Sequence, residues 1–417
     1  MEGWSLAAVG LVLVGFALVS RRVSGTIVTP AMVFVGIGLV LGNAGFDLFG
    51  SGLSLEGIRR LAEATLALVL FADASGIDTR SLRREAAMPV RLLAIGLPLT
   101  IVFGSLVAAV LFADLSIWEA VVLAVLLAPT DAALGQTVVA DERLPSALRQ
   151  GLNVESGLND GVCVPLLFGA IAIASIDQAL DSQSSILGDL VKELLIAASV
   201  GVAVAVVVAF GWRIADKHQS ISGQWAQVVP LAAAMIAYTA TDELGGSGFI
   251  ACFVAGLLFG RLVGPTRDTV IHLTEELGGV LSAATFFMFA AVLAGPAFEH
   301  LDVTTVIYAV LSLTVARMLP VALSLVRAGT TWQTKAFAGW FGPRGLASIV
   351  FGLTVVLESG LHGYQRIIDV TTITVILSVL LHGVTAPPLT NRYIGWLRSS
   401  VKPQSLDDVG TTPQPQG

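Results

Sequence analysis

The repetition of apolar segments long enough to cross a lipid bilayer is the feature that most constrains this chain. A spanning helix needs about 20 apolar residues, and about thirteen such segments follow one another here. Only 13% of the 417 residues are charged, against about 25% in soluble domains. The sequence therefore predicts an all-α polytopic membrane protein. The segments cover residues 4–20, 27–48, 59–77, 90–112, 116–140, 148–176, 187–215, 225–241, 246–263, 270–295, 303–328, 334–358 and 367–390.

Basic residues in the loops predict how these segments are oriented. They concentrate in the loops on one side, beginning with Arg21 and Arg22 after the first segment, and loops of this kind face the cytoplasm. Because the two arginines follow that segment instead of preceding it, we predict a spanning helix there and not a signal peptide. We expect a multi-pass protein of the cell membrane with its N-terminus outside. Residues 1–398 form the transmembrane domain, and the polar, Pro-rich residues 399–417 are expected to be a short disordered cytoplasmic tail.

Two segments contain a helix breaker at the depth of the membrane. Segment 116–140 has Pro129 near its middle, and segment 334–358 contains Gly-Pro-Arg-Gly at 342–345. Proline removes a backbone donor and clashes with the preceding turn, and irregular backbone survives in a membrane only where it is buried or lines a cavity. Interrupted helices in both halves of a chain are typical of inverted-repeat transporters with a midplane site. We therefore predict that the first six and the last six segments are inverted repeats joined by the seventh.

The stretch GLNVESGLNDGV, residues 151–162, places polar side chains where a membrane helix should be apolar. At helical spacing Ser156 and Asp160 share one face, as do Glu155 and Asn159. Ionisable groups in a spanning helix default to functional hypotheses, and hard oxygen ligands are those that a dehydrated alkali cation needs. A buried carboxylate that holds either a cation or a proton is the minimum device for exchange. The five histidines lie mostly in loops or near segment ends, so no transition-metal cluster is expected.

The strings APTDAA, residues 128–133, and ESGLNDG, residues 155–161, resemble the monovalent cation:proton antiporter-1 family of the sodium/proton exchanger type. The resemblance covers almost the whole chain in the order and spacing of its segments. It implies an antiporter fold with a dimerisation domain and a six-helix core domain, working as a homodimer in the lipid bilayer. It also implies electroneutral exchange of an alkali cation, most often Na⁺, for H⁺.

The resemblance further implies roles for individual residues. Asp160 corresponds to the shared cation and proton site, and Asn159 completes the Asn-Asp motif of the family. Because Asn159 is neutral, we expect one cation to be exchanged for one proton. The other side chains implied at the ion site are Thr130, Asp131, Ser156 and Asp73, the last in LFADASG.

An ion pair is expected between Glu155 and an arginine of the late segments. The candidates are Arg317 in VARMLP and Arg344 in GPRG, since a charge buried in lipid needs a partner. Two further alternatives stay open: Asp131 caps the half-helix of its own segment, and Asn159 only hydrogen-bonds between helices. The chain departs from the family pattern at Ala132, commonly proline, and at Pro343, commonly leucine, which leaves the preferred cation open.

Other functions fit the sequence less well. A channel needs a continuous polar path or a repeated filter, whereas the acidic groups here cluster at one place. A symporter of organic solutes should lack the Asn-Asp pair, and a potassium-efflux system usually carries a nucleotide-binding domain. No phosphate-binding loop or catalytic triad occurs, so the chain is not expected to be an enzyme. No cofactor and no nucleic-acid partner are expected, only the transported Na⁺, K⁺ or Li⁺ and H⁺.

Overall fold

The computed structural model describes residues 2–23, 26–48, 54–77, 87–131, 134–178, 186–358 and 360–400, and over these residues it is helical without a strand. The tail predicted to be disordered lies outside them from residue 401 onward. Six helices are long and apolar enough to cross a membrane: Ala87–Leu111, Ser146–Ser175, Val191–Lys217, Arg267–Glu299, Val303–Ser324 and Tyr364–Ser399. The predicted all-α membrane fold is thereby confirmed for the described part of the chain. The count of thirteen spans and the inverted repeats stay predictions.

The helices follow the predicted segments along the chain. Their bounds are α1 Glu2–Val23, α2 Pro30–Leu41, α3 Leu55–Gly76, α5 Ala87–Arg91, η2 Leu92–Gly96, α6 Leu97–Leu111, α7 Ile117–Leu126, α8 Gln136–Val139, α9 Ser146–Gln178, α10 Ile186–Lys217, α11 Gly223–Glu243, α12 Gly248–Val263, η3 Gly264–Thr266, α13 Arg267–Glu299, α14 Val303–Leu313, α15 Val315–Ser324, α16 Trp332–Trp340, α17 Leu346–Glu358 and α18 Tyr364–Ser400.

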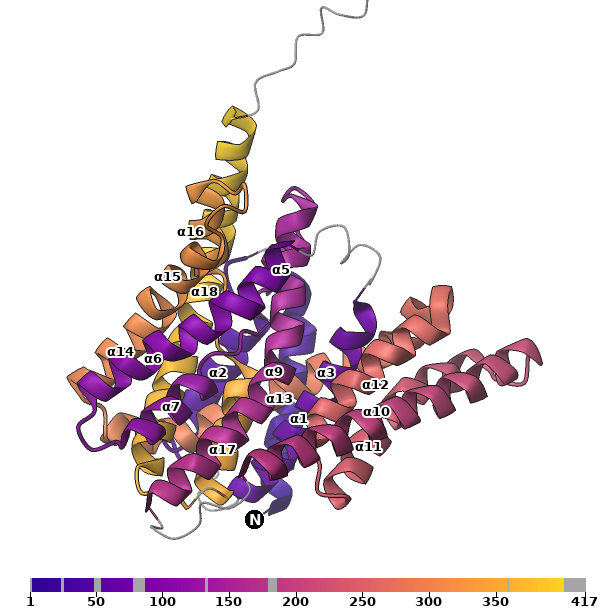
Figure 1. Cartoon of the computed structure of the whole chain (residues 1–417), viewed down its shortest axis with the longest axis horizontal. Coiled ribbons are helices and arrows are strands. Elements are labelled where there is room, and N and C mark those ends of the chain that lie inside the picture. Colours follow the sequence, from indigo (N-terminus) through magenta and orange to yellow (C-terminus); the bar gives the residue numbers. More distant parts are fainter. Residues whose placement is uncertain are drawn as a thin grey trace, which may run out of the picture.

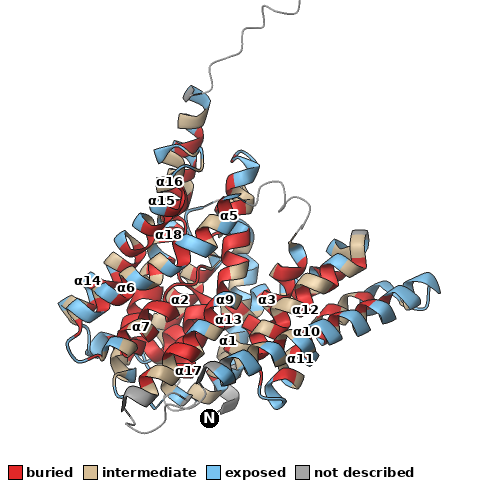
Figure 2. Cartoon of the chain, in the orientation of Figure 1, coloured by how far each residue is buried: buried red, intermediate tan, exposed pale blue. Residues whose placement is uncertain are grey.

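The helices form two groups with α9 and α13 between them (Figure 1). In one group α12 packs against α3, α10 and α11, and in the other α6 packs against α7 and α15. Buried residues concentrate in the centre of the molecule, and exposed ones cover α10 (Figure 2). The apolar stretch of α18 is 78% buried within the chain, whereas that of α10 is 22% buried. Helix α18 is therefore an interior helix, and α10 presents its apolar side chains outward.

Two glycines of α12 allow the backbone of α3 to approach very closely. A Cβ atom at Gly256 or Gly260 would collide with the backbone carbonyls of Phe71 and Ser75 respectively. The Ser75 hydroxyl donates to the Gly256 carbonyl at 3.1 Å. Small residues that allow such backbone approach are typical of tightly packed membrane helices. This contact fixes the part of α3 that carries Asp73.

The side chain of Asn43 supplies a hydrogen bond that Pro296 cannot make within α13. Pro296 has no N–H, so the Val292 carbonyl lacks its helical donor. Asn43 supplies one through Nδ2 at 2.5 Å, and its Oδ1 accepts the Gly295 N–H at 3.0 Å. The Asn43 backbone N–H also donates to the Ala291 carbonyl. The end of α2 is thus attached to the last turns of α13.

We expect Asn43→Ala to lower stability, because both side-chain hydrogen bonds to α13 are lost. The cost should be about 1 kcal/mol, since water near the helix end replaces part of the bonding. The measurement is the melting temperature in detergent, with Asn153→Ala at an exposed site on α9 as the matched control. Equal melting of the two variants would show that the bonds to α13 contribute nothing.

Candidate ion-binding site

Two interrupted helices cross at the centre of the candidate site. Helix α7 starts with a capping box between Ser116 and Glu119 and ends at Leu126, where Pro129 prevents further helical bonding. Helices α16 and α17 are separated by the unwound residues 341–345. The Asp131 backbone N–H donates to the Pro343 carbonyl at 2.8 Å. The structure therefore places both sequence-predicted breaks in direct contact.

The carboxylate of Asp131 joins the two breaks. Its Oδ2 accepts the N–H of Leu346, the first residue of α17, at 2.8 Å, and its Oδ1 accepts the Leu134 N–H at 3.2 Å. A Cβ atom at Gly345 would collide with Oδ2, so only glycine fits there. Asp131 therefore caps its own segment, one of the alternatives that the sequence left open, and it also caps the N-terminus of α17, where the helix dipole favours a negative charge.

The guanidinium of Arg344 caps the C-terminal end of α7. Its Nη1 donates to the carbonyls of Ala128 at 2.6 Å and Pro129 at 3.0 Å. The Ser348 hydroxyl donates to the Leu126 carbonyl at 2.9 Å. These carbonyls have no helical donors because α7 has ended, and a cation is favourable at this end of a helix dipole. The end of α7 and the start of α17 thus each meet a side chain of complementary charge from the other interrupted segment.

Glu155 on α9 pairs with Arg317 on α15. The two bonds run from Nη1 to Oε1 at 2.5 Å and from Nη2 to Oε2 at 2.8 Å. Both residues are 1% exposed, so this is a fully desolvated bidentate pair. Of the two arginines that the sequence left open, Arg317 is therefore the partner, whereas Arg344 bonds to backbone carbonyls. The Arg317 guanidinium also lies against Gly342, so it packs on the unwound residues between α16 and α17.

Three polar side chains, one from the unwound residues after α7 and two from α9, come together beside the crossing, and Asp160 follows them on α9. The hydroxyls of Thr130 and Ser156 are 2.9 Å apart, and Asn159 Nδ2 donates to the Thr130 hydroxyl at 2.7 Å. Asn159 therefore does bond between helices, as the alternative reading expected. Its Oδ1 and the Oδ1 of Asp160 are buried, and neither has a hydrogen-bond partner among the residues that the structure describes. Buried oxygens without a donor are the groups that a cation or proton can satisfy.

Asp73 approaches from α3. Gly157 of α9 faces its Cβ, and a Cβ atom built at Gly157 would lie 3.7 Å away in ordinary contact. Asp160 interacts electrostatically with both Asp73 and Asp131. Within the described ranges, however, no three His, Cys, Asp or Glu side chains are close enough to ligate one metal ion.

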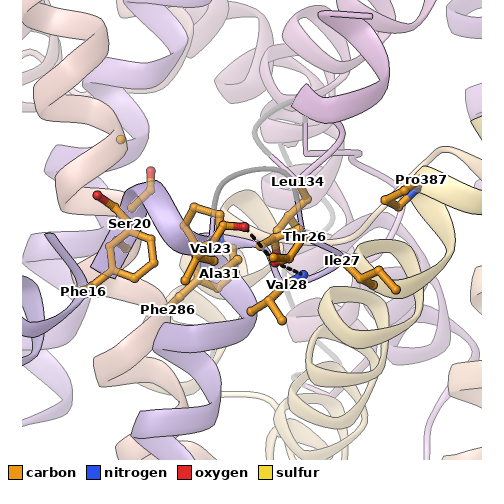
Figure 3. Close-up of a pocket in the computed structure, with 16 residues that line it drawn as sticks. Phe16, Ser20, Val23, Thr26, Ile27, Val28, Ala31, Leu134, Phe286 and Pro387 are labelled. Atoms are coloured by element: carbon orange, nitrogen blue, oxygen red, sulfur yellow. Dashed lines mark hydrogen bonds between the residues drawn. The ribbon is translucent and has the colours of Figure 1, made fainter. Parts of the chain in front are cut away.

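A cavity of about 470 Å³ lies among α1, α2, α13 and α18 (Figure 3). Its walls come from the end of α1, the start of α2, one face of α13 and the Gly383–Pro387 stretch of α18. The Thr26 hydroxyl closes the turn between α1 and α2 by donating to the Val23 carbonyl. Leu134, whose N–H is bonded to Asp131, also lines this cavity. The cavity therefore reaches the segment that follows the first helix break.

Sequence reasoning missed two polar residues of α18 that contact the second break. Ser378 and His382 are buried in α18, the most buried of the six candidate spans, although the histidines were expected mostly in loops or near segment ends. The signal available in the sequence was their spacing of one helical turn within an otherwise apolar run.

The chain is similar to one protein family and to several curated relatives over most of its length. The family described as "Sodium/hydrogen exchanger, transmembrane" matches residues 8–392. The K(+)/H(+) antiporter NhaP of Alkalimonas amylolytica is 26% identical over 404 residues, which cover 95% of this chain and 67% of that protein. The Na(+)/H(+) antiporter ApNhaP of Aphanothece halophytica is 27% identical, covering 86% of this chain and 68% of that protein. The chain thus spans about two thirds of the length of the curated relatives that it matches.

A solved structure shares the fold. It is that of the sodium proton antiporter MjNhaP1 from Methanocaldococcus jannaschii, with a TM-score of 0.77 and 22% sequence identity. The match covers 95% of this chain and 100% of that one.

Proposed function

Because this chain belongs to the sodium/hydrogen exchanger family, we propose that it is a secondary antiporter that exchanges one alkali cation for one proton across the membrane. The observation that carries the proposal is the buried Asp160 carboxylate. One of its oxygens has no hydrogen-bond partner in the described part of the chain, and it stands beside the hydroxyl and amide groups of the crossing. A proton or a cation satisfies this oxygen, and each excludes the other.

The exchange cycle follows from that competition. A cation bound by Asp160, Ser156 and Thr130 neutralises the carboxylate, and a proton on Asp160 does the same without the cation. Only the two neutralised forms carry no uncompensated charge in the low-dielectric interior. Movement of the site from one side of the membrane to the other is therefore favoured when it holds a cation or a proton, and disfavoured when it is empty. This couples the cation flux to the proton flux.

Two cations are candidates. Sodium is supported by the family description and by the name of the Aphanothece relative. Potassium is the second candidate because the Alkalimonas and Shewanella relatives are named K(+)/H(+) antiporters. Purified protein in liposomes with a pH-sensitive dye, given LiCl, NaCl or KCl in turn, tests both. The absence of a pH response to every alkali chloride would reject the antiport proposal.

The orientation and assembly belong to the same proposal. The basic residues in the loops support a cytoplasmic location for the end of α1, and in that orientation the cavity beside Leu134 would face the cytoplasm. We also propose a homodimer, for which the outward apolar face of α10 is a candidate contact.

Exchange is expected to be electroneutral, because Asn159 supplies no second carboxylate beside Asp160. Sodium-driven proton flux should then be insensitive to a membrane potential set with potassium and valinomycin. Controls without protein correct for passive leak. A turnover that changes strongly with the imposed potential would mean that a second carboxylate, for which Asp131 or Asp73 is placed, also carries a proton.

A further inference from the structure

Two buried polar residues of α18 have no role in the exchange cycle described above. Ser378 and His382 lie one helical turn apart and are 0% and 2% exposed. A buried imidazole and hydroxyl are costly in a membrane helix unless their hydrogen bonds are made. The hydrogen-bond partners of Ser378 and His382 therefore indicate their structural role.

His382 holds the last residue of α16. Its Nε2 lies 2.9 Å from the carbonyl of Trp340, where the helix ends and leaves carbonyls without helical donors. A carbonyl only accepts, so Nε2 carries the ring proton in this contact. The imidazole thus substitutes for the backbone donor that the break has removed.

Ser378 holds the other end of the break. Its Oγ accepts the backbone N–H of Arg344 at 2.7 Å and lies 3.2 Å from Nδ1 of His382. Nδ1 also lies 2.9 Å from the backbone carbonyl of Ser378. In the tautomer that carries its proton on Nε2, Nδ1 can only accept, so it bonds to the serine hydroxyl and not to that carbonyl. One continuous chain of bonds therefore runs from Arg344 through Ser378 and His382 to Trp340, and it spans the unwound residues 341–345.

The break that these two residues hold is the one that positions the candidate ion site. Arg344 donates to the Ala128 and Pro129 carbonyls, and the neighbouring Pro343 carbonyl accepts the Asp131 N–H. Thr130 lies between these contacts. A shift of residues 341–345 therefore moves the hydroxyl of Thr130 relative to Ser156 and Asp160.

We propose that Ser378 and His382 are positioning residues of the cation site, acting through the second helix break and touching neither cation nor proton. This inference rests on the proposed antiport function. Because Asp160 is untouched, loss of the bonds should weaken cation binding more than it slows the cycle. An unsatisfied buried carbonyl is a cost that corresponds to about a tenfold loss of affinity.

The test compares His382→Leu with His382→Gln in liposomes, measuring the apparent KM for the cation and the maximal rate. Glutamine keeps an N–H donor of similar reach, whereas leucine keeps only the volume. We expect leucine to raise the KM about tenfold and change the maximal rate by no more than about twofold, with glutamine restoring the KM. The control is Thr385→Val on the same helix, which loses a 2.9 Å bond to the Trp340 indole and not to the break.

The possible results distinguish a failure of the positioning role from a failure of the antiport function. A wild-type KM in His382→Leu, an equal KM in the leucine and glutamine variants, or the same rise in Thr385→Val would each overturn the positioning role. If the leucine variant does not fold, Ser378→Ala replaces it, since it removes one hydroxyl and should raise the KM in the same direction. A wild-type KM there would also overturn the proposal. Absence of exchange in the unmodified protein rejects the antiport function instead, which is a distinct result.

Discussion

Asp160→Asn is expected to abolish cation-driven proton flux while the protein still folds. The amide has almost the shape of the carboxylate, but it can neither carry the exchanged proton nor offset the charge of the cation. Because Oδ1 of the native Asp160 has no hydrogen-bond partner among the described residues, the substitution breaks no bond at that atom. The measurement is dye-reported flux in liposomes, accompanied by melting in detergent.

Asp216→Asn is the matched control for this result. Asp216 is exposed near the end of α10, away from the crossing, and the same chemical change there should leave flux unaltered. Flux at the wild-type level from a well-folded Asp160→Asn variant would remove Asp160 from the exchange.

Glu155→Ala should give the largest loss of stability of any single substitution proposed for this chain. It leaves the Arg317 guanidinium buried without its carboxylate, and breaking a buried pair in this way costs about 3–5 kcal/mol. Arg317→Ala should cost a similar amount for the same reason. The measurement is melting in detergent, where the loss should be evident before any change in ion preference.

A double variant distinguishes a lost pair from a general packing defect. Glu155→Leu combined with Arg317→Met removes both charges and keeps most of the volume, so it should recover much of the stability. Arg60→Ala is the surface control: Arg60 is 76% exposed in its pair with Glu56, and exposed pairs contribute little. If Glu155→Ala melts like the wild type, the buried pair has no structural role.

The helix breaks could be predicted from the sequence because their cause is local. Pro129 and the Gly-Pro-Arg-Gly residues 342–345 disfavour helix through their own backbone chemistry, and hydropathy alone delimits the apolar segments. The order of polar groups on α9 follows equally from helical spacing. These features depend only on neighbours in the chain.

The partners at the crossing could not be predicted, because they depend on how distant segments meet. Asp131 bonds to Leu346, and nothing near Asp131 in the sequence indicates that a second helix will begin there. The choice between Arg317 and Arg344 for Glu155 had the same origin, since both arginines lie in late apolar segments of the sequence. Only the crossing decides that Arg344 is used by the carbonyls of α7.

The close contact between α12 and α3 has a consequence for the distance between two acidic side chains. Asp73 belongs to a helix fixed against α12 by Gly256 and Gly260, whereas Asp160 belongs to α9. Any cycle in which α9 slides past α3 changes the distance between the two carboxylates. The separation of the two acidic side chains is therefore set by the packing of α9 on α3, and not by either helix alone.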